Sequence, residues 1–173
     1  STVTVVRALN WMAGESVRVV NLSFAGPRNA VLSATLGRAM RQGMLPVAAA
    51  GNNGPEASPA YPAADEGLIA VTAIDAAKRL YASANRGDYI DLAAPGVDIW
   101  TAATGGGGAY RSGTSYAAPY VAAVAAAMLA RHPRLPSDLL KESLRRSAID
   151  LGTAGRDSDF GWGLVRAPGH CAE

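Results

Sequence analysis

The chain alternates short apolar runs with stretches in which apolar residues recur every three or four positions. Residues 17–24 (VRVVNLSF) are rich in β-branched side chains and predict a strand, and the apolar run 47–50 predicts another. Between the two strands, apolar residues recur with the spacing of a helix, which Gly43 ends. These residues are Val31, Leu32, Leu36, Ala39 and Met40. This β-α-β order implies parallel strands joined by a right-handed crossover.

The rest of the chain continues the same alternation. Residues 68–74 and 89–93 predict two further strands, and residues 51–67, with their glycines and prolines, predict a loop. Two more helices are expected at 115–131 and 137–148. Near-continuous apolar strands alternating with helices are typical of an α/β layer fold with both faces of the sheet covered.

The first residues already carry a helical pattern. Apolar side chains recur with helical spacing within a few positions of Ser1, at Val5, Val6, Leu9, Met12 and Ala13. The few residues before these positions leave no room for the segment that usually leads into a helix and caps its start. We therefore expect the chain to be part of a longer protein.

Composition narrows the class of protein. The chain has 173 residues, of which 49% are hydrophobic and 17% charged, which favours one domain with a sizeable core. The net charge is +2 and the Lys and Arg residues are scattered, so a nucleic-acid partner is not expected. The longest apolar run, 116–130, is interrupted by Pro119 and is shorter than the roughly 20 residues that cross a bilayer, so no membrane partner is expected either.

Two features argue against other kinds of site. Cys171 is the only cysteine, which excludes an internal disulfide and a cysteine-based metal cluster. The glycine run 105–108 lacks the spacing of a phosphate-binding loop, so it predicts the tip of a hairpin. We expect no cofactor and no metal site in this chain.

A candidate nucleophile lies in the segment 113–119 (GTSYAAP). Ser115 stands where a long apolar helix begins, after a glycine-rich loop. Backbone N–H groups at a helix start are unpaired and carry the positive end of the helix dipole, so an oxyanion formed beside Ser115 would be stabilised there. A serine that only caps the helix is the alternative.

A second candidate follows the strand predicted at 47–50. The segment 49–54 (AAGNNG) places Asn52 at the carboxyl end of that strand, where open α/β sheets bind ligands. Taken alone, Asn52 is a turn signal. Taken together with Ser115, it is a candidate donor to an oxyanion that the Ser115 N–H would also bind. Acyl transfer is the reaction class that uses both groups.

Four segments in order carry a family resemblance: 20–26 (VNLSFAG), 49–52 (AAGN), 92–96 (LAAPG) and 113–119 (GTSYAAP). With them the chain resembles the C-terminal part of a subtilisin-like serine protease (subtilase) catalytic domain. The resemblance implies a three-layer α/β fold with a mostly parallel, doubly wound sheet, of which residues 1–173 would form only the C-terminal part of a single domain. It also implies a cis peptide bond at Tyr61–Pro62.

The resemblance also implies roles for individual residues. Ser115 would be the nucleophile and Asn52 the oxyanion donor. An extended substrate would pair as an added strand with Ser23, Phe24 and Ala25, and one wall of the pocket would be formed by Ala49, Ala50 and Gly51. Tyr116 and Tyr120 stand where the family usually has methionine and often has histidine, so these positions affect the shape of the pocket.

The chain contains no matching base for the serine. His132 lies 17 residues after Ser115, about 25 Å along a continuous helix, and His170 lies near the end of the chain. In subtilases the order is Asp, His, Ser, and the motifs of the first two are absent here. We expect a serine endopeptidase whose Asp and His lie outside this chain, so that the isolated chain is inactive; a non-catalytic peptide-binding module is the alternative.

The resemblance implies the remaining expectations. The partners would be a peptide or protein substrate, the missing N-terminal half of the domain, and a second copy bound through the exposed edge of the strand at 17–24. The full-length protein would be secreted or attached to the cell envelope, and calcium would bind to it.

Overall fold

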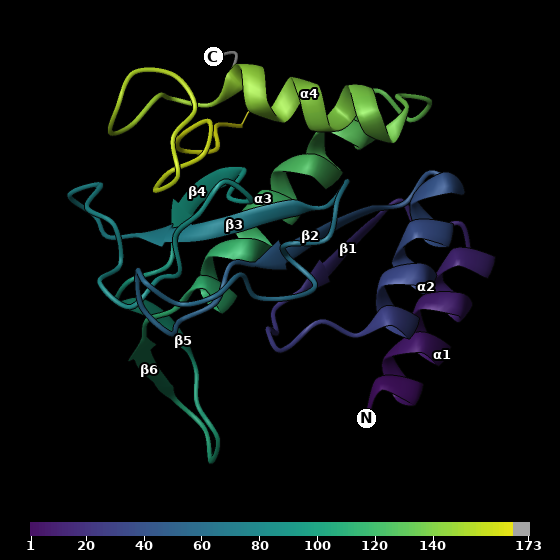
Figure 1. Cartoon of the computed structure of the whole chain (residues 1–173), viewed down its shortest axis with the longest axis horizontal. Coiled ribbons are helices and arrows are strands. Elements are labelled where there is room, and N and C mark those ends of the chain that lie inside the picture. The colour runs from purple at the N-terminus through teal and green to yellow at the C-terminus, as the bar shows by residue number, and fades with distance from the viewer. Residues whose placement is uncertain (168–173) are drawn as a thin grey trace.

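The computed structural model describes residues 1–167 and contains a four-stranded parallel sheet in the order β1-β2-β3-β4 (Figure 1). The strands are β1 (Val19–Leu22), β2 (Leu45–Ala49), β3 (Ile69–Ile74) and β4 (Leu92–Pro95). Val47 pairs with Asn21 on one side and with Ile69 on the other. β2 and β3 are buried along their whole length, which explains why both appear as continuous apolar runs.

Helices cover both faces of this sheet. α1 (Thr2–Gly14) and α2 (Ala30–Arg41) lie side by side on one face, and α3 (Thr114–Arg131) crosses the other face in contact with all four strands. α4 (Ser137–Ser147) packs against α3 at the top of Figure 1. The expected three-layer α/β fold is therefore confirmed.

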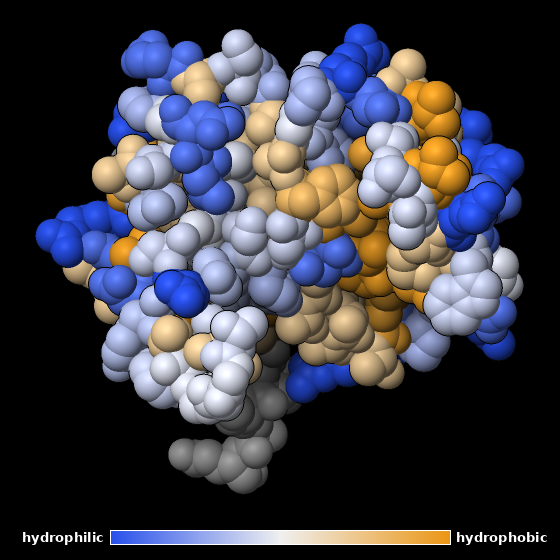
Figure 2. Space-filling view, turned by 90° about the horizontal axis from the view of Figure 1, so that it is seen from below, coloured by the Kyte–Doolittle hydropathy of each residue, from blue (hydrophilic) through white to orange (hydrophobic). Residues whose placement is uncertain are grey.

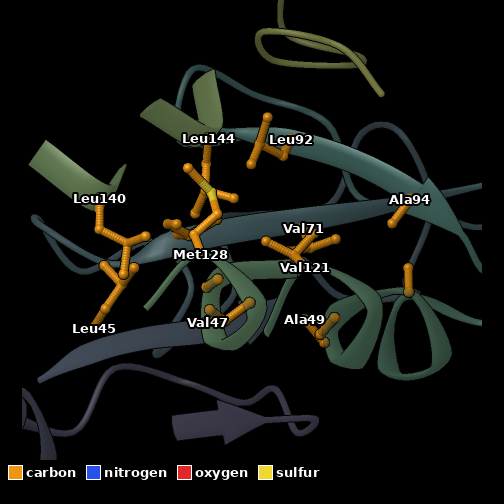
Figure 3. Packing of buried hydrophobic residues seen from close by; sticks show 14 of the residues in the cluster. Leu45, Val47, Ala49, Val71, Leu92, Ala94, Val121, Met128, Leu140 and Leu144 are labelled. Atoms are coloured by element: carbon orange, nitrogen blue, oxygen red, sulfur yellow. The ribbon is translucent and has the colours of Figure 1, made fainter. Parts of the chain in front are cut away.

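The alternation of side chains along the strands separates two cores. Val47 and Val71 point toward α3 and α4, where they meet Val121, Met128 and Leu144 (Figure 3). The intervening residues of the strands face α1 and α2 and pack against a second buried cluster, which includes Leu9, Val20, Leu22, Leu36, Ala48 and Ala70.

A separate two-stranded hairpin follows β4. β5 (Ile99–Ala102) and β6 (Gly108–Arg111) are antiparallel and extend away from the body of the molecule (Figure 1). Gly105, Gly106 and Gly107 form the turn, all with positive φ, as the glycine run predicted. Trp100 and Tyr110 pair edge to face at 5.1 Å on the exposed side of this hairpin.

Two strands begin or end at other residues than the sequence predicts. The strand expected at 17–24 is confined to Val19–Leu22, and the one expected at 89–93 begins later, at Leu92. The Ile90 N–H donates to the Gly87 carbonyl in a turn, and the Tyr89 hydroxyl donates to the Ala50 carbonyl. These contacts keep residues 89 and 90 out of the ladder although they are apolar or aromatic.

The two edges of the main sheet are unlike. β4 is covered by the segment 162–165: the Ala93 N–H donates to the Gly163 carbonyl, and the Val165 N–H donates to the Ala93 carbonyl. Within residues 1–167, β1 has a single neighbour, β2, and its other edge is open. The sequence predicted this open edge, but it is less apolar than expected because Asn21 is exposed.

A partly buried ion cluster attaches α4 to the residue that precedes β4. Asp91, which is 4% exposed, bonds to Arg145 and lies 3.3 Å from the Lys141 ammonium. Lys141 also donates to the Leu68 carbonyl. Burial lowers the pKa of Lys141 from its usual 10.5, opposed by the nearby carboxylate.

The surface seen from below is unevenly apolar. Hydrophobic residues gather on the right half of that view, the side on which α1 and α2 lie (Figure 2). Val3, Trp11 and Val31 on these two helices are each at least 60% exposed. Among the described residues, no helix has the length and apolar character needed to cross a bilayer.

Candidate active site

Ser115 lies in the first turn of α3, at the end of the sheet where the strands finish. Gly113 precedes the helix in an extended, positive-φ conformation, and its N–H donates to the Gly96 carbonyl at 2.7 Å. The Tyr116 N–H turns back to the Gly113 carbonyl. Neither the Ser115 N–H nor its Oγ bonds to another residue of the described chain. The helix start thus presents both a hydroxyl and an unpaired N–H group.

Asn52 is held next to this helix start. Its Oδ1 accepts two hydrogen bonds from Thr114, from the N–H at 2.9 Å and from Oγ1 at 3.0 Å. Thr114 Oγ1 in turn accepts the Gly51 N–H at 3.1 Å. Because Oδ1 is the atom that accepts, the Asn52 amide nitrogen remains as a donor, and it lies 3.3 Å from where a β-carbon on Gly113 would be.

Ser23 joins the end of β1 to the same helix start. Its Oγ donates to the Ser115 carbonyl at 2.8 Å and accepts from the Asn21 amide at 2.9 Å. Pro119 has no N–H and cannot make the helical bond to that carbonyl. Ser23 therefore satisfies an acceptor that the proline leaves unpaired.

The segment after Ser23 is open to an added strand. Phe24 and Ala25 are exposed, and their backbone groups make no hydrogen bond within residues 1–167. Directly after them, Gly26 pairs with Tyr61 through two backbone bonds of 2.9 Å. The Tyr61–Pro62 bond is cis, as the resemblance implied. This backbone is anchored at one end and unpaired at the position expected to bind substrate.

Ala49, Ala50 and Gly51 form the buried end of β2 and the turn that follows it. All three are buried, and Gly51 has φ +108, which favours glycine. The Ala50 carbonyl accepts from the Tyr89 hydroxyl at 2.7 Å, and burial raises the pKa of that hydroxyl. The structure thus brings all eight predicted site residues to one end of the sheet, on or beside Ser23, Asn52 and Ser115.

Three residues at this site were missed by the sequence patterns. Thr114 orients Asn52, Tyr89 holds the Ala50 carbonyl, and Asn85 bonds to the loop after Asn52. Thr114 lies within the serine segment, so its position offered a signal. Asn85 and Tyr89 lie in a segment without a recognisable motif.

The described residues contain no base beside Ser115. His132 caps the opposite end of α3, and its N–H bonds to the Met128 carbonyl. His170 and Cys171 lie outside the described residues. In the described part of the chain, no group of three or more His, Cys, Asp or Glu side chains could hold a metal ion.

The fold and the site together define a three-layer α/β protein with a serine at a helix start and a carboxamide beside it. A model of the subtilase family, peptidase S8, matches residues 1–163. The chain belongs to the subtilase family, a family of serine proteases.

Similar proteins include the minor extracellular protease Epr of Bacillus subtilis (strain 168), which is 34% identical over 164 residues. Subtilisin of Bacillus pumilus is also 34% identical, over 166 residues. The matches cover 94% and 93% of this chain but only 25% and 59% of these relatives. The chain thus spans between a quarter and three fifths of their length.

Solved structures show the same fold. Fervidolysin from Fervidobacterium pennivorans, described as a keratinolytic enzyme related to subtilisin, matches with a TM-score of 0.87 and 29% identity. The match covers 96% of this chain and 28% of fervidolysin. The S41 psychrophilic protease matches with a TM-score of 0.87 and 26% identity, covering 97% of this chain and 64% of that protein.

Proposed function

We propose that this chain is the serine-bearing part of a serine endopeptidase, with Ser115 as the nucleophile and Asn52 as an oxyanion donor. The observation that carries this proposal is the pair of hydrogen bonds from Thr114 to Asn52 Oδ1. They place a carboxamide from the end of β2 beside the residue that precedes Ser115 and leave its amide nitrogen to donate. Family membership supports the same reaction class.

In the proposed reaction, Ser115 Oγ attacks the carbonyl carbon of the peptide bond. The developing oxyanion receives hydrogen bonds from the Ser115 N–H and the Asn52 amide nitrogen. Collapse of the tetrahedral intermediate releases the amine and leaves an acyl group on Ser115, which water then removes. Phe24 and Ala25 would hold the substrate backbone through strand pairing.

The reaction also needs a base that accepts the Ser115 proton and then gives it to the leaving amine. Residues 1–167 place none beside Ser115, so we propose that His and Asp of the triad come from residues outside this chain. The isolated chain would then be inactive. The alternative, a non-catalytic peptide-binding module, is favoured by the unpaired backbone of Phe24 and Ala25, because strand pairing needs no base.

The remaining partners follow from the same proposal. The open edge of β1 would pair with the missing N-terminal half of the domain or with a second copy of the chain. Secretion or attachment to the cell envelope is supported by a relative that is named extracellular. Calcium binding by the full-length protein is part of the same proposal and is supported only by family membership.

A fluorophosphonate probe tests the proposal, because it reacts with an activated serine. We expect almost no labelling of the isolated chain and strong labelling at Ser115 in the complete translation product of the gene. Ser115→Ala in the complete product is the control and should abolish labelling. Equal labelling of both proteins would contradict the missing base, and an unlabelled complete product would favour the peptide-binding module.

Asn52→Ala tests the second role in the complete product. Loss of one oxyanion donor costs about 10²- to 10³-fold in kcat, a magnitude measured in a subtilisin and applied to Asn52 by analogy. KM should change little, because the bond forms mainly in the transition state. A kcat within about twofold of the wild type would remove Asn52 from the mechanism.

A further inference from the structure

Asn85, in the loop between β3 and β4, is a fully buried amide with 0% exposure. Its Oδ1 accepts the Asn53 N–H at 2.8 Å, and its Nδ2 donates to the Ser58 carbonyl at 3.2 Å. Its backbone N–H donates to the Gly51 carbonyl at 3.1 Å. One residue thus bonds to the loop on both sides of Asn52.

Together with Thr114, Asn85 holds Asn52 in place. Thr114 holds the Asn52 side chain from the direction of α3. Asn85 holds the backbone of Gly51 and Asn53, the two neighbours of Asn52, from the direction of β3 and β4. Asn52 is itself exposed and lies in a turn, so its own burial does not hold it in place.

The chemistry of the position favours asparagine. The side chain must accept one bond and donate another while it is buried, which a carboxamide does without a charge. The space is narrow, since a β-carbon on Gly51 would lie 2.9 Å from the Asn85 amide. A longer glutamine would not fit, and an aspartate would lose the bond to Ser58 and bury a charge.

The neighbouring loop residue supports the same part of β2. The Tyr89 hydroxyl donates to the Ala50 carbonyl at 2.7 Å. The segment between β3 and β4 therefore contacts residues 50, 51 and 53 in succession, and a shift of this segment would move Asn52 relative to Ser115.

We propose that Asn85 is a positioning residue that holds the Asn52 amide in place for the oxyanion through its bonds to Gly51 and Asn53. The inference rests on the proposed function and deepens it. It locates the support of one catalytic donor in a segment 33 positions away in the sequence. Because the donor acts in the transition state, Asn85 governs kcat rather than substrate affinity.

Steady-state kinetics of the complete translation product test the proposal. We expect Asn85→Ala to lower kcat by about tenfold or more while KM stays within about twofold, since a small displacement of a catalytic group costs rate. Asn85→Ser serves in the same assay if the alanine variant fails to fold. A loss confined to KM would overturn the proposal.

A double-mutant cycle with Asn52→Ala separates positioning from general destabilisation. If Asn85 acts through Asn52, Asn85→Ala should cost less than about twofold in kcat once Asn52 is already alanine. Full additivity of the two losses would overturn the proposal. Leu140→Val, which removes one methylene from the buried face of α4, is the control for lowered stability and should leave kcat unchanged.

Amide hydrogen exchange on the complete translation product tests the inference independently of the proposed function, because it needs no peptidase activity. The Asn53 N–H should be protected in the wild type and in Leu140→Val, and should lose protection in Asn85→Ala. Unchanged protection in Asn85→Ala overturns the role of Asn85 whatever the activity. Absence of peptidase activity in the wild-type complete product would instead overturn the proposed function.

Discussion

At the scale of single residues, the orientation of the Asn52 carboxamide depends on Thr114. The Thr114 hydroxyl is fully buried and links the Gly51 N–H to Asn52 Oδ1. Removal of this hydroxyl would leave the Gly51 N–H without its acceptor and Oδ1 with one bond instead of two. Thr114 thus fixes the side chain of Asn52, whereas Asn85 bonds to the backbone of its two neighbours.

Thr114→Val in the complete translation product should lower kcat by about 3- to 10-fold. This factor corresponds to the net free energy that one hydrogen bond contributes. Steady-state kinetics measure this change. Thr114→Ser keeps the hydroxyl and should stay close to the wild type. An equal loss in the serine variant would show that the methyl group, not the hydroxyl, matters.

Asp75 provides a residue-scale prediction about pH. Its carboxylate accepts the N–H groups of Ala77 and Arg79 and pairs with the Arg79 guanidinium at 2.7 Å. The backbone bond from Arg79 is the main cause that lowers the pKa of Asp75 below 3.8. Because the folded pKa is depressed, the stabilisation is present above the unfolded pKa and is lost as the pH falls through the folded one.

The wild type should therefore be more stable than Asp75→Asn at neutral pH, and this difference should shrink on acidification below 3.8. Chemical denaturation at a series of pH values measures it. A difference that stays constant down to the lowest pH at which the protein folds would show that the carboxylate is not responsible.

Not all of the site could be predicted from single residues and their spacing. Ser115 and Asn52 stood out because both lie in recognisable segments. Ser115 begins an apolar helix after a glycine-rich loop, and Asn52 follows an apolar strand. Asn85 did not, since its partners Asn53 and Ser58 lie 32 and 27 positions away and no local pattern marks a buried amide. Long-range hydrogen bonds of this kind emerge only when the loops are folded against one another.

At the scale of elements, the apolar strands and helical stripes could be predicted, whereas their ends could not. Hydrophobic periodicity located β3 to within one residue, because both of its faces are buried. β4 was placed three residues too early, because Tyr89 and Ile90 are used in a turn and in loop contacts instead of the ladder. Burial alone does not distinguish a strand from a buried turn.

The covering of β4 depends on close backbone contacts at glycines. Gly163 has φ +106, and a β-carbon there would collide with the Ile149 carbonyl group. Gly155 has φ +86 but has nothing within 4 Å of the same position. An alanine at Gly155 would therefore test the cost of a left-handed backbone alone, whereas an alanine at Gly163 would add the cost of steric overlap.

Gly155→Ala should lower the free energy of unfolding by about 1–2 kcal/mol, the cost of a left-handed conformation. Gly163→Ala should lower the free energy of unfolding by about 1–3 kcal/mol more than Gly155→Ala does, because the added methyl group overpacks the contact with Ile149. Chemical denaturation of both variants measures the difference. Equal costs would show that the segment 162–165 can move away from Ile149 without loss.

At the scale of the whole molecule, the open edge of β1 should make the isolated chain self-associate. Its unpaired backbone groups are a template for another strand. Light scattering across a range of concentrations should detect species larger than the monomer. A lysine at the exposed position of β1, Asn21→Lys, should weaken association, whereas Thr4→Lys, which adds the same charge on α1, should not.

A strictly monomeric chain at high concentration would contradict this prediction. The same outcome would be expected if the complementary part of the domain were bound, so the measurement uses the isolated chain. Addition of that part should then compete with self-association, because both partners need the same edge.

The covering of β4 by the segment 162–165 limits how far such an assembly can grow. Two copies that join their β1 strands are related by a two-fold axis and run antiparallel across the junction, forming one continuous eight-stranded sheet. Both outer rims of that sheet are then occupied by each copy's own backbone. A third copy finds no rim to extend, so pairing through this sheet stops at two subunits and does not propagate into a fibre.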